Sequence, residues 1–242
     1  MQPEASNLSS VESTLKAIND HKVSFSVDCV IFGYGDEGLK ILLLECNLPP
    51  FIGSWSLLGD FVRHNEDIDT AAYRVLRHYT SLRDIYLEQV ATFGETDRHP
   101  LARVITTAYY SLMKLSDYNN HVFTGGLRLK WFPIDALPRL AFDHQGIIDA
   151  CYTRLQKSLR ERPIGFELLP RRFTLSQLQT LYEVVLNIEL DKRNFRRKLR
   201  SLGLLVDTGT TQKDVSHRPA KLFSFDYATY RRRRSGGFQF EL

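Results

Sequence analysis

Alternating and apolar stretches near the start of the chain predict two β-strands. Residues 23–34 and 39–45 carry these patterns, and the glycine-rich segment 33–38 between them is typical of a hairpin connection. In the first stretch polar and apolar side chains alternate, with Ser24, Ser26 and Asp28 between Phe25, Val27 and Cys29. Because strand side chains point alternately to opposite faces, the three polar groups are expected on one face.

Helical spacing of apolar residues predicts three helices further along the chain. The first runs from about Asp69 to Tyr79, the second over 174–187 and the third over 192–202. Thr174 followed by Gln177 forms a capping box at the start of the second, and Asp191 caps the third. Residues 204–208 and 220–225 then predict two strands around a polar wing. This order indicates a winged helix-turn-helix.

The third helix has one apolar edge and an otherwise basic surface. Arg forms paired hydrogen bonds with guanine, and Asn with adenine, in the major groove, so the pattern indicates DNA recognition. The candidate DNA-binding residues are Thr174, Lys192, Arg193, Asn194, Arg196, Arg197, Arg200 and, on the wing, Arg218. Lys213 and His217 are further wing candidates for phosphate contacts, with an ordinary exposed hairpin as the alternative.

Charge divides the chain into an acidic and a basic half. Residues 1–159 hold 15 Lys and Arg against 19 Asp and Glu, a net −4, whereas residues 160–242 hold 17 against 9, a net +8. A basic domain of this size favours a polyanion as partner. The run Arg231–Arg234 either follows the DNA backbone or is a solvated tail. The three widely spaced cysteines indicate buried thiols and not disulfides.

The sequence shows neither a membrane span nor a signal peptide. No apolar run approaches the roughly 18–20 residues of a membrane span, and the N-terminus lacks the plan of a signal peptide. We therefore expect a cytoplasmic protein with no membrane partner.

Residues 55–82 resemble the Nudix hydrolase box with most of its metal-binding glutamates missing. Glu66 and Arg74 keep their places, whereas Val75, His78 and Tyr79 stand where the family has carboxylates and Ser81 replaces the closing glycine. Mg²⁺ needs several converging oxygen ligands, which one glutamate does not provide. The resemblance therefore implies no catalytic residues, no metal, no cofactor and no enzymatic activity.

Two further resemblances extend this reading to the whole chain. Residues 92–100 and the strand after them are similar to the segment downstream of the box in ADP-ribose-type Nudix proteins. Residues 22–226 resemble the Nudix-related transcriptional regulator family, with close matches at 190–199 and 218–222. The fold implied is α+β: a Nudix-like α/β/α sandwich with a mixed sheet, then a winged helix. The implied partners are a second copy of the chain, giving a homodimer, and a palindromic double-stranded operator.

The expected domain boundaries follow from the same resemblance and from the charge division. Residues 1–21 form an N-terminal helix or arm, 22–159 the Nudix-like effector domain, and 160–242 the winged helix with a basic C-terminal tail. An effector is expected to change the arrangement of the two domains and thereby the spacing of the recognition helices.

The effector predicted from the residues is a small neutral sugar. The candidate pocket residues are Asp28, Trp55, Asp60, Glu95, Asp97 and Arg98. Carboxylates accept hydrogen bonds from sugar hydroxyls, and cations for a diphosphate are few, which favours a pentose such as L-arabinose and a role in sugar utilisation. ADP-ribose, with a role in NAD metabolism, is the alternative. Asp28 capping backbone amides, Glu66 capping the box helix and an Asp97–Arg98 ion pair are structural alternatives for these acids.

Two other functional classes stay open. The first is a residual Nudix pyrophosphatase that uses Glu66 and applies its basic domain to RNA. The second is a passive adaptor whose Nudix-like half only dimerises. Nucleotide release from ADP-ribose and a ligand-dependent melting shift distinguish the three.

Overall fold

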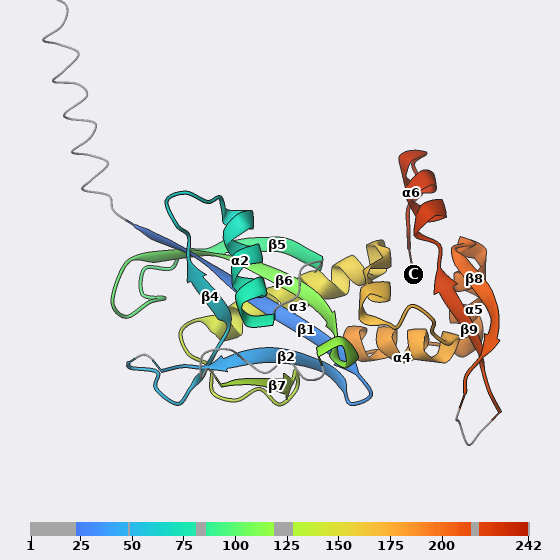
Figure 1. Ribbon diagram of the computed structural model, residues 1–242, viewed down its shortest axis with the longest axis horizontal. Helices are drawn as coiled ribbons and strands as arrows, with labels where there is room; N and C mark the ends of the chain where they lie inside the picture. Colours follow the sequence, from blue (N-terminus) through green and yellow to red (C-terminus); the bar gives the residue numbers. More distant parts are fainter. Residues whose placement is uncertain (1–22, 48, 81–85, 119–127, 214–217, 242) are drawn as a thin grey trace, which may run out of the picture.

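A computed structural model describes residues 23–47, 49–80, 86–118, 128–213 and 218–241, and shows two parts joined side by side (Figure 1). The N-terminal helix or arm predicted for residues 1–21, the box position Ser81 and the wing residue His217 lie outside the described residues. None of the helices described is long and apolar enough to cross a membrane.

The first part is built on a seven-stranded mixed sheet, counted over the described residues. Its strands are β1 (Ser24–Gly35), β2 (Gly38–Glu45), β3 (Trp55–Ser56), β4 (Leu58–Phe61), β5 (Tyr86–Phe93), β6 (Val104–Lys114) and β7 (Leu129–Pro133). The long central strand β1 pairs antiparallel with β2 and β4 and parallel with β6. The expected mixed sheet is confirmed.

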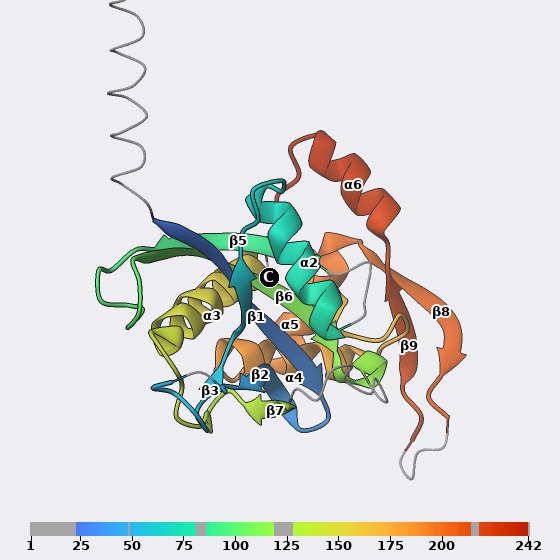
Figure 2. The ribbon, with the colours of Figure 1, turned by 60° about the vertical axis from the view of Figure 1, so that its left-hand side comes forward.

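Helices α2 (Ile68–Thr80) and α3 (His144–Glu161) cover opposite faces of this sheet (Figure 2). Alternation along β1 explains why: Val27, Cys29 and Ile31 pack toward α2, whereas Val30 and Phe32 pack in the cluster that includes α3. The predicted α/β/α sandwich is confirmed, and the predicted box helix is α2. Two 3₁₀ helices, η1 (Leu115–Tyr118) and η2 (Pro163–Leu168), follow β6 and α3.

The second part is a winged helix. It consists of α4 (Leu175–Leu186), α5 (Lys192–Leu202), and the antiparallel strands β8 (Leu205–Thr211) and β9 (Lys221–Phe225), followed by α6 (Tyr227–Ser235). Both predicted caps are present: Thr174 and Gln177 form the capping box of α4, and Asp191 accepts a hydrogen bond from the Asn194 amide at 2.8 Å. The two helices and both wing strands are confirmed.

The arginine run at the C-terminus is not an unstructured tail. It forms α6, whose Tyr230 is only 9% exposed, and the chain after it returns to bury Phe240. The two rings meet edge to face, with centroids 6.3 Å apart. These two aromatic side chains hold the basic helix in a fixed position.

A shared hydrophobic core joins the two parts. Leu155 and Leu159 of α3 belong to the same buried cluster as Phe166 of η2 and Leu178 and Leu181 of α4. The Tyr182 hydroxyl donates to the Leu159 carbonyl at 3.2 Å, and the Tyr152 hydroxyl and Gln156 amide both donate to the Val185 carbonyl. The domain boundary expected after residue 159 thus falls inside α3, and no flexible linker separates the two parts there.

A largely buried carboxylate attaches the end of α3 to the sheet. Glu88 of β5 accepts hydrogen bonds from the Tyr86 hydroxyl, from Tyr110 Oη at 3.0 Å, from Arg154 Nε at 2.7 Å and from Arg162 Nη2 at 2.5 Å. Burial raises the pKa of Glu88, but these donors outweigh it and hold the pKa below its ordinary value. Nothing in the local sequence pattern indicated this network. Cys29, Cys46 and Cys151 are buried and form no disulfide, as predicted.

Candidate nucleic-acid interface and effector site

The exposed face of α5 carries a stripe of arginines. Phe195 and Leu199 are buried against the rest of the winged helix, at 6% and 1% exposure. Arg193, Arg197 and Arg200 are exposed and recur at intervals of four and three, which places them along the opposite side of the helix. A helix with this construction presents guanidinium groups to a groove while its apolar edge stays fixed in the domain.

Neighbouring predicted DNA contacts have additional structural roles. Asn194 accepts a hydrogen bond from Arg197 Nη2 at 2.8 Å, which orders that guanidinium, and Lys192 is exposed. Arg196 is only partly exposed: its Nη2 lies 3.4 Å from Ser176 Oγ on α4, and its Nε is buried without a hydrogen-bond partner. Thr174 is 3% exposed, and its hydroxyl accepts from the Gln177 amide as the cap of α4. The arrangement therefore sets Arg196 and Thr174 apart from the outer stripe.

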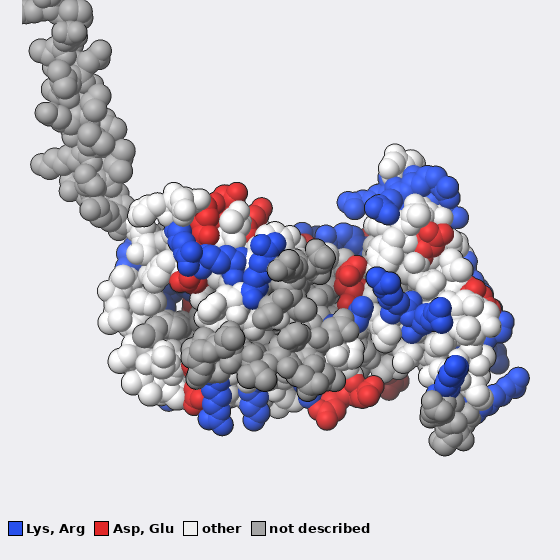
Figure 3. Space-filling model, viewed as in Figure 1, with Lys and Arg blue, Asp and Glu red and all other residues white. Residues whose placement is uncertain are grey.

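Basic side chains extend beyond α5 over the rest of the winged helix. Figure 3 shows Lys and Arg gathered on α6 and near the open end of the β8–β9 hairpin. Arg218 and Lys213 are exposed at that end, and Lys221 pairs with Asp207 at 2.9 Å. Charge of one sign spread over neighbouring elements fits a phosphate backbone better than a compact anion.

A buried ionic cluster lies at the end of the sheet where α3 begins. Arg98, 8% exposed, donates to both oxygens of Asp143 at 2.8 Å and reaches Asp28 Oδ2 at 3.4 Å. His144 Nδ1 accepts a hydrogen bond from the Leu57 amide at 2.9 Å, and its Nε2 lies 3.7 Å from Asp28 Oδ1. Burial lowers the pKa of His144, so its imidazole is neutral near pH 7. Asp143 and His144 were missed because no sequence pattern singles them out.

Aromatic rings surround this cluster. Phe142 has a φ of 53°, a left-handed conformation that is rare for a bulky residue. Its ring stacks on His99 at 5.1 Å with an interplanar angle of 10°, and lies 4.6 Å from Phe51. Strained backbone of this kind concentrates at functional sites. The loops carrying these three rings therefore meet beside Arg98.

A second ionic cluster lies on the other face of the sheet. Arg74 of α2 donates to Glu66 at 2.6 Å, to Asp60 at 2.5 Å and to the Phe61 carbonyl at 2.9 Å. The hydrogen bonds from Arg74 lower the pKa of Glu66 to about 2. The helix cap is Asp67, which accepts from the Thr70 amide, so the suggested capping role of Glu66 is wrong.

The positions of the missing box carboxylates offer no carboxylate oxygen to a metal ion. Val75 is buried at 1% exposure, and the His78 and Tyr79 rings contact each other at 4.8 Å. Within the part of the chain that the structure describes, no group of three His, Cys, Asp or Glu side chains is placed to hold a metal ion.

The six predicted effector residues do not converge on one pocket. Asp28 pairs with Gly59 across β1 and β4, and Val27 pairs with Asp60, so Asp28 and Asp60 point to opposite faces. The Trp55 ring packs edge to face on Phe132 at 4.7 Å, and Glu95 and Asp97 are exposed. The suggested Asp97–Arg98 ion pair is wrong, because Arg98 pairs with Asp143 and Asp28 instead.

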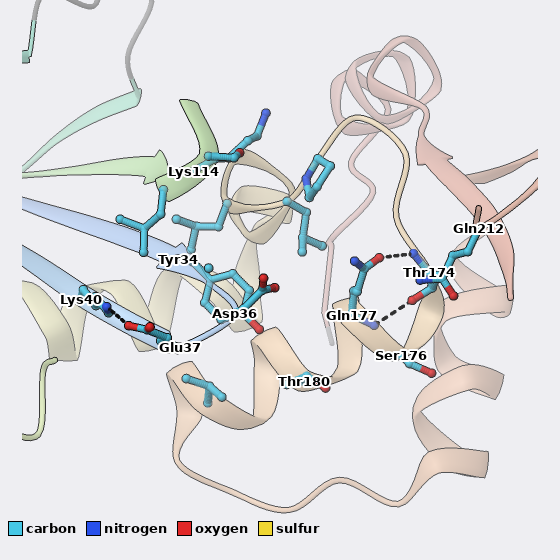
Figure 4. Close-up of a pocket in the computed structure, with 18 of the residues that line it drawn as sticks. Tyr34, Asp36, Glu37, Lys40, Lys114, Thr174, Ser176, Gln177, Thr180 and Gln212 are labelled. Atoms are coloured by element: carbon cyan, nitrogen blue, oxygen red, sulfur yellow. Dashed lines mark hydrogen bonds and ion pairs between the residues drawn. The ribbon is translucent and has the colours of Figure 1, made fainter. Parts of the chain in front are cut away.

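A cleft of about 790 Å³ separates the tip of the β1–β2 hairpin from the start of α4. Figure 4 shows Lys40 paired with Glu37 on the hairpin, facing Thr174, Gln177 and Thr180 on the helix side. Two smaller clefts of about 600 and 500 Å³ also lie between the parts. None of the six predicted effector residues lines these three clefts.

Comparison with known proteins covers both parts of the chain. Residues 165–225 match the NrtR DNA-binding winged helix domain. The chain is 31% identical over 209 residues to the ADPR responsive transcriptional repressor NtrR of Acinetobacter baylyi, covering 85% of this chain and 83% of that protein. The chain belongs to the NrtR family of Nudix-fold regulators with a C-terminal winged helix.

Two solved NrtR structures are similar to the chain. Shewanella oneidensis NrtR complexed with a 27mer DNA matches with a TM-score of 0.76 and 29% identity, over 89% of this chain and 97% of that one. The NUDIX domain of the same NrtR complexed with ADP ribose matches with a TM-score of 0.51 and 28% identity, over 64% of this chain and 99% of that one. The Nudix assignment of the first part and the winged helix of the second are thus both confirmed.

The pentose assignment, and with it sugar utilisation, is wrong. The NrtR relative that spans both parts responds to ADPR, and the NUDIX domain structure holds ADP ribose, which supports the alternative effector. The error lay in assuming that Asp28 and Asp60 were both available to sugar hydroxyls. Asp28 is instead engaged by Arg98 and Asp60 by Arg74, on opposite faces of the sheet.

Proposed function

We propose that this protein is a transcriptional repressor of NAD metabolism genes that binds palindromic DNA as a homodimer and responds to ADP-ribose. The observation that carries the proposal is the alignment with an ADPR responsive repressor across both the Nudix fold and the winged helix. A match confined to one part would support a function for that part alone. This match covers both the Nudix-fold part and the DNA-binding winged helix.

The DNA is read by α5. Arg193, Arg197 and Arg200 enter the major groove, and Lys213 and Arg218 bind phosphates beside it. Support comes from their exposure and from the buried Phe195 and Leu199, which fix the helix in the domain.

The effector binds beside the Arg98 cluster. ADP-ribose needs an aromatic surface for its base and cations for its diphosphate. The stacked rings of Phe142 and His99 offer the first. Arg103 offers the second, since it is exposed and uses Nη1 on the Glu95 carbonyl, which leaves other N–H groups free to donate.

The Nudix part does not hydrolyse its effector. Two observations support this: the buried Val75 replaces a carboxylate, and the remaining Glu66 is held by Arg74. A Mg²⁺ ion would have to displace the Arg74 guanidinium from the one box glutamate left, and Val75 supplies no oxygen ligand beside it.

The response to the effector passes through the arrangement of the two subunits. A hinge between residues 159 and 160 would have to open the core shared by α3, η2 and α4 and break the hydrogen bonds on Leu159 and Val185. Rotation of one rigid subunit against the other changes the spacing of the α5 helices without that cost.

The test is a melting experiment on the full chain with ADP-ribose, AMP and L-arabinose. ADP-ribose at one hundred times its dissociation constant is expected to add about 2.7 kcal/mol of stability. For a chain of this size that is a rise of about 5–11 °C. His99→Ala should lose much of the shift, while the exposed His64→Ala should keep it. A shift with L-arabinose, or none with ADP-ribose, would contradict the proposal.

A further inference from the structure

The C-terminal helix α6 lies outside the part of the chain that matches the family's winged helix domain. That match ends at residue 225, and α6 begins at Tyr227. Four consecutive arginines, Arg231–Arg234, occupy this helix, and all four are exposed. A concentration of charge this high on one short helix needs an explanation that the matched domain does not supply.

Contacts with α5 and with the following chain fix α6 in place. Arg233 Nη1 donates to the Leu202 carbonyl at 2.7 Å, at the C-terminal end of α5, and its guanidinium lies over the Phe238 ring. The Asp226 side chain caps the helix by accepting from the Thr229 amide at 2.9 Å. Arg233 is thus a structural residue that ties the basic helix to the proposed recognition helix.

Two of the other arginines have no such role. Among the described residues, the side chains of Arg231 and Arg234 form no hydrogen bond or ion pair, whereas Arg232 donates to Thr229. Exposed, ordered by their helix and without an acidic partner, these two guanidinium groups are available to an external anion.

The position of α6 relative to α5 suits a contact beside the same groove. In both views α5 lies at a level between α6 above and the open end of the β8–β9 hairpin below (Figures 1 and 2). A major groove that holds a recognition helix is bordered by a phosphate backbone on each side. The hairpin and α6 therefore lie on the two sides of the proposed recognition helix where those backbones would run.

We propose that α6 is a third DNA contact, in which Arg231 and Arg234 bind backbone phosphates across the major groove from the wing. The inference rests on the proposed DNA-binding function. With α5 in the groove, the wing meets the phosphates on one side and α6 those on the other. Phosphate contacts add affinity and fix orientation without reading sequence.

The experiment measures affinity against salt for a duplex of about 40 base pairs, longer than three helical turns, that wild-type protein selects from a random library. Each lost phosphate contact makes the slope of log K against log salt shallower by about 0.9. In the proposed homodimer R231A/R234A removes two phosphate contacts from each subunit, four in all, and is therefore expected to have a slope shallower by about 4. R231K/R234K keeps the charge and should keep the wild-type slope, as should the charge-matched control R77A/R139A on the Nudix part.

A second readout needs no variant. Trimming the duplex from its ends should reduce the wild-type slope by the same amount once the phosphates under α6 are removed, before the bases under α5 are reached. An unchanged slope in R231A/R234A, or an equal loss in R231K/R234K, overturns the proposal while leaving the repressor function intact. If wild-type protein selects no duplex at all, the proposed function fails, and this inference fails with it.

Discussion

Glu88→Gln is expected to destabilise the protein substantially. The Glu88 carboxylate is 13% exposed and accepts four hydrogen bonds, two of them from the guanidinium groups of Arg154 and Arg162. Glutamine keeps the shape and one acceptor oxygen, which serves the tyrosines and Arg162, but it removes the charge and turns an N–H₂ group toward the Arg154 Nε donor. The perturbation therefore removes the ionic part of the attachment between β5 and the end of α3.

The magnitude follows from those two ionic bonds. Hydrogen bonds to charged groups contribute about 1.5–3 kcal/mol, against about 0.5–1.5 kcal/mol for neutral ones, so each loses roughly 1 kcal/mol. Arg154 is 43% exposed and Arg162 31% exposed, and water compensates part of the loss. We expect a loss of about 1–2 kcal/mol, equivalent to about 2–8 °C in melting temperature.

Urea denaturation of the full chain measures this loss directly. Glu37→Gln is the matched control, because Glu37 pairs with Lys40 while 80% exposed and should show no measurable change. In a cycle with Arg162→Met, a coupling energy of about 1 kcal/mol is expected between positions 88 and 162. The folded pKa of Glu88 lies below its unfolded value, so its contribution is present above about pH 4.3 and is lost as pH falls through the folded pKa. A stability within about 0.5 kcal/mol of wild type, the usual range for a surface substitution, would refute the reasoning.

Four other predictions concern the site and the fold. Gly59→Ala should destabilise by several kcal/mol, roughly the cost of overpacking plus a disturbed buried ion pair, because a Cβ there would lie 2.4 Å from Asp28 Oδ1 and 2.8 Å from the Val27 carbonyl oxygen. Gly146→Ala in α3, which meets nothing within 4 Å, should instead stabilise by about 0.5–1 kcal/mol in the same melting experiment. Wild-type protein should lose stability as pH falls below about 6.5, because His144 is protonated in the unfolded chain while burial keeps it neutral in the folded one. His144→Asn keeps an acceptor for the Leu57 amide and should make the melting temperature less dependent on pH in that range. Arg200→Ala should weaken DNA binding by about 1–3 kcal/mol in an anisotropy titration and leave the ADP-ribose melting shift intact, and equal affinity would remove Arg200 from the interface.

Local signals in the sequence were enough to predict the winged helix. The capping box at Thr174, the cap at Asp191 and the apolar spacing in 192–202 depend only on neighbouring residues, and α4 and α5 begin where those signals indicate. The mixed sheet and the two-faced sandwich followed from the resemblance to a Nudix protein, which the similar NrtR structures bear out.

The effector site could not be predicted in the same way, because its geometry depends on strand register and on distant contacts. Asp28 and Arg98 are 70 residues apart, and Asp143 a further 45 along the chain from Arg98. Nothing in the sequence reveals that Val27, and not Asp28, is opposite Asp60. The helical state of the arginine run likewise depends on the contact between the Tyr230 and Phe240 rings, which forms only because the chain turns back after the helix.

The central claim is that the protein binds DNA through α5 and that its affinity for DNA changes when ADP-ribose binds. The most direct test is an anisotropy titration of the selected duplex with the full chain, with and without saturating ADP-ribose and without divalent metal. The account predicts a change in affinity of about 5–150-fold, the usual range of allosteric coupling. L-arabinose should leave the affinity unchanged. Equal affinities with and without ADP-ribose, or ADP-ribose turnover when Mg²⁺ is added, would contradict it.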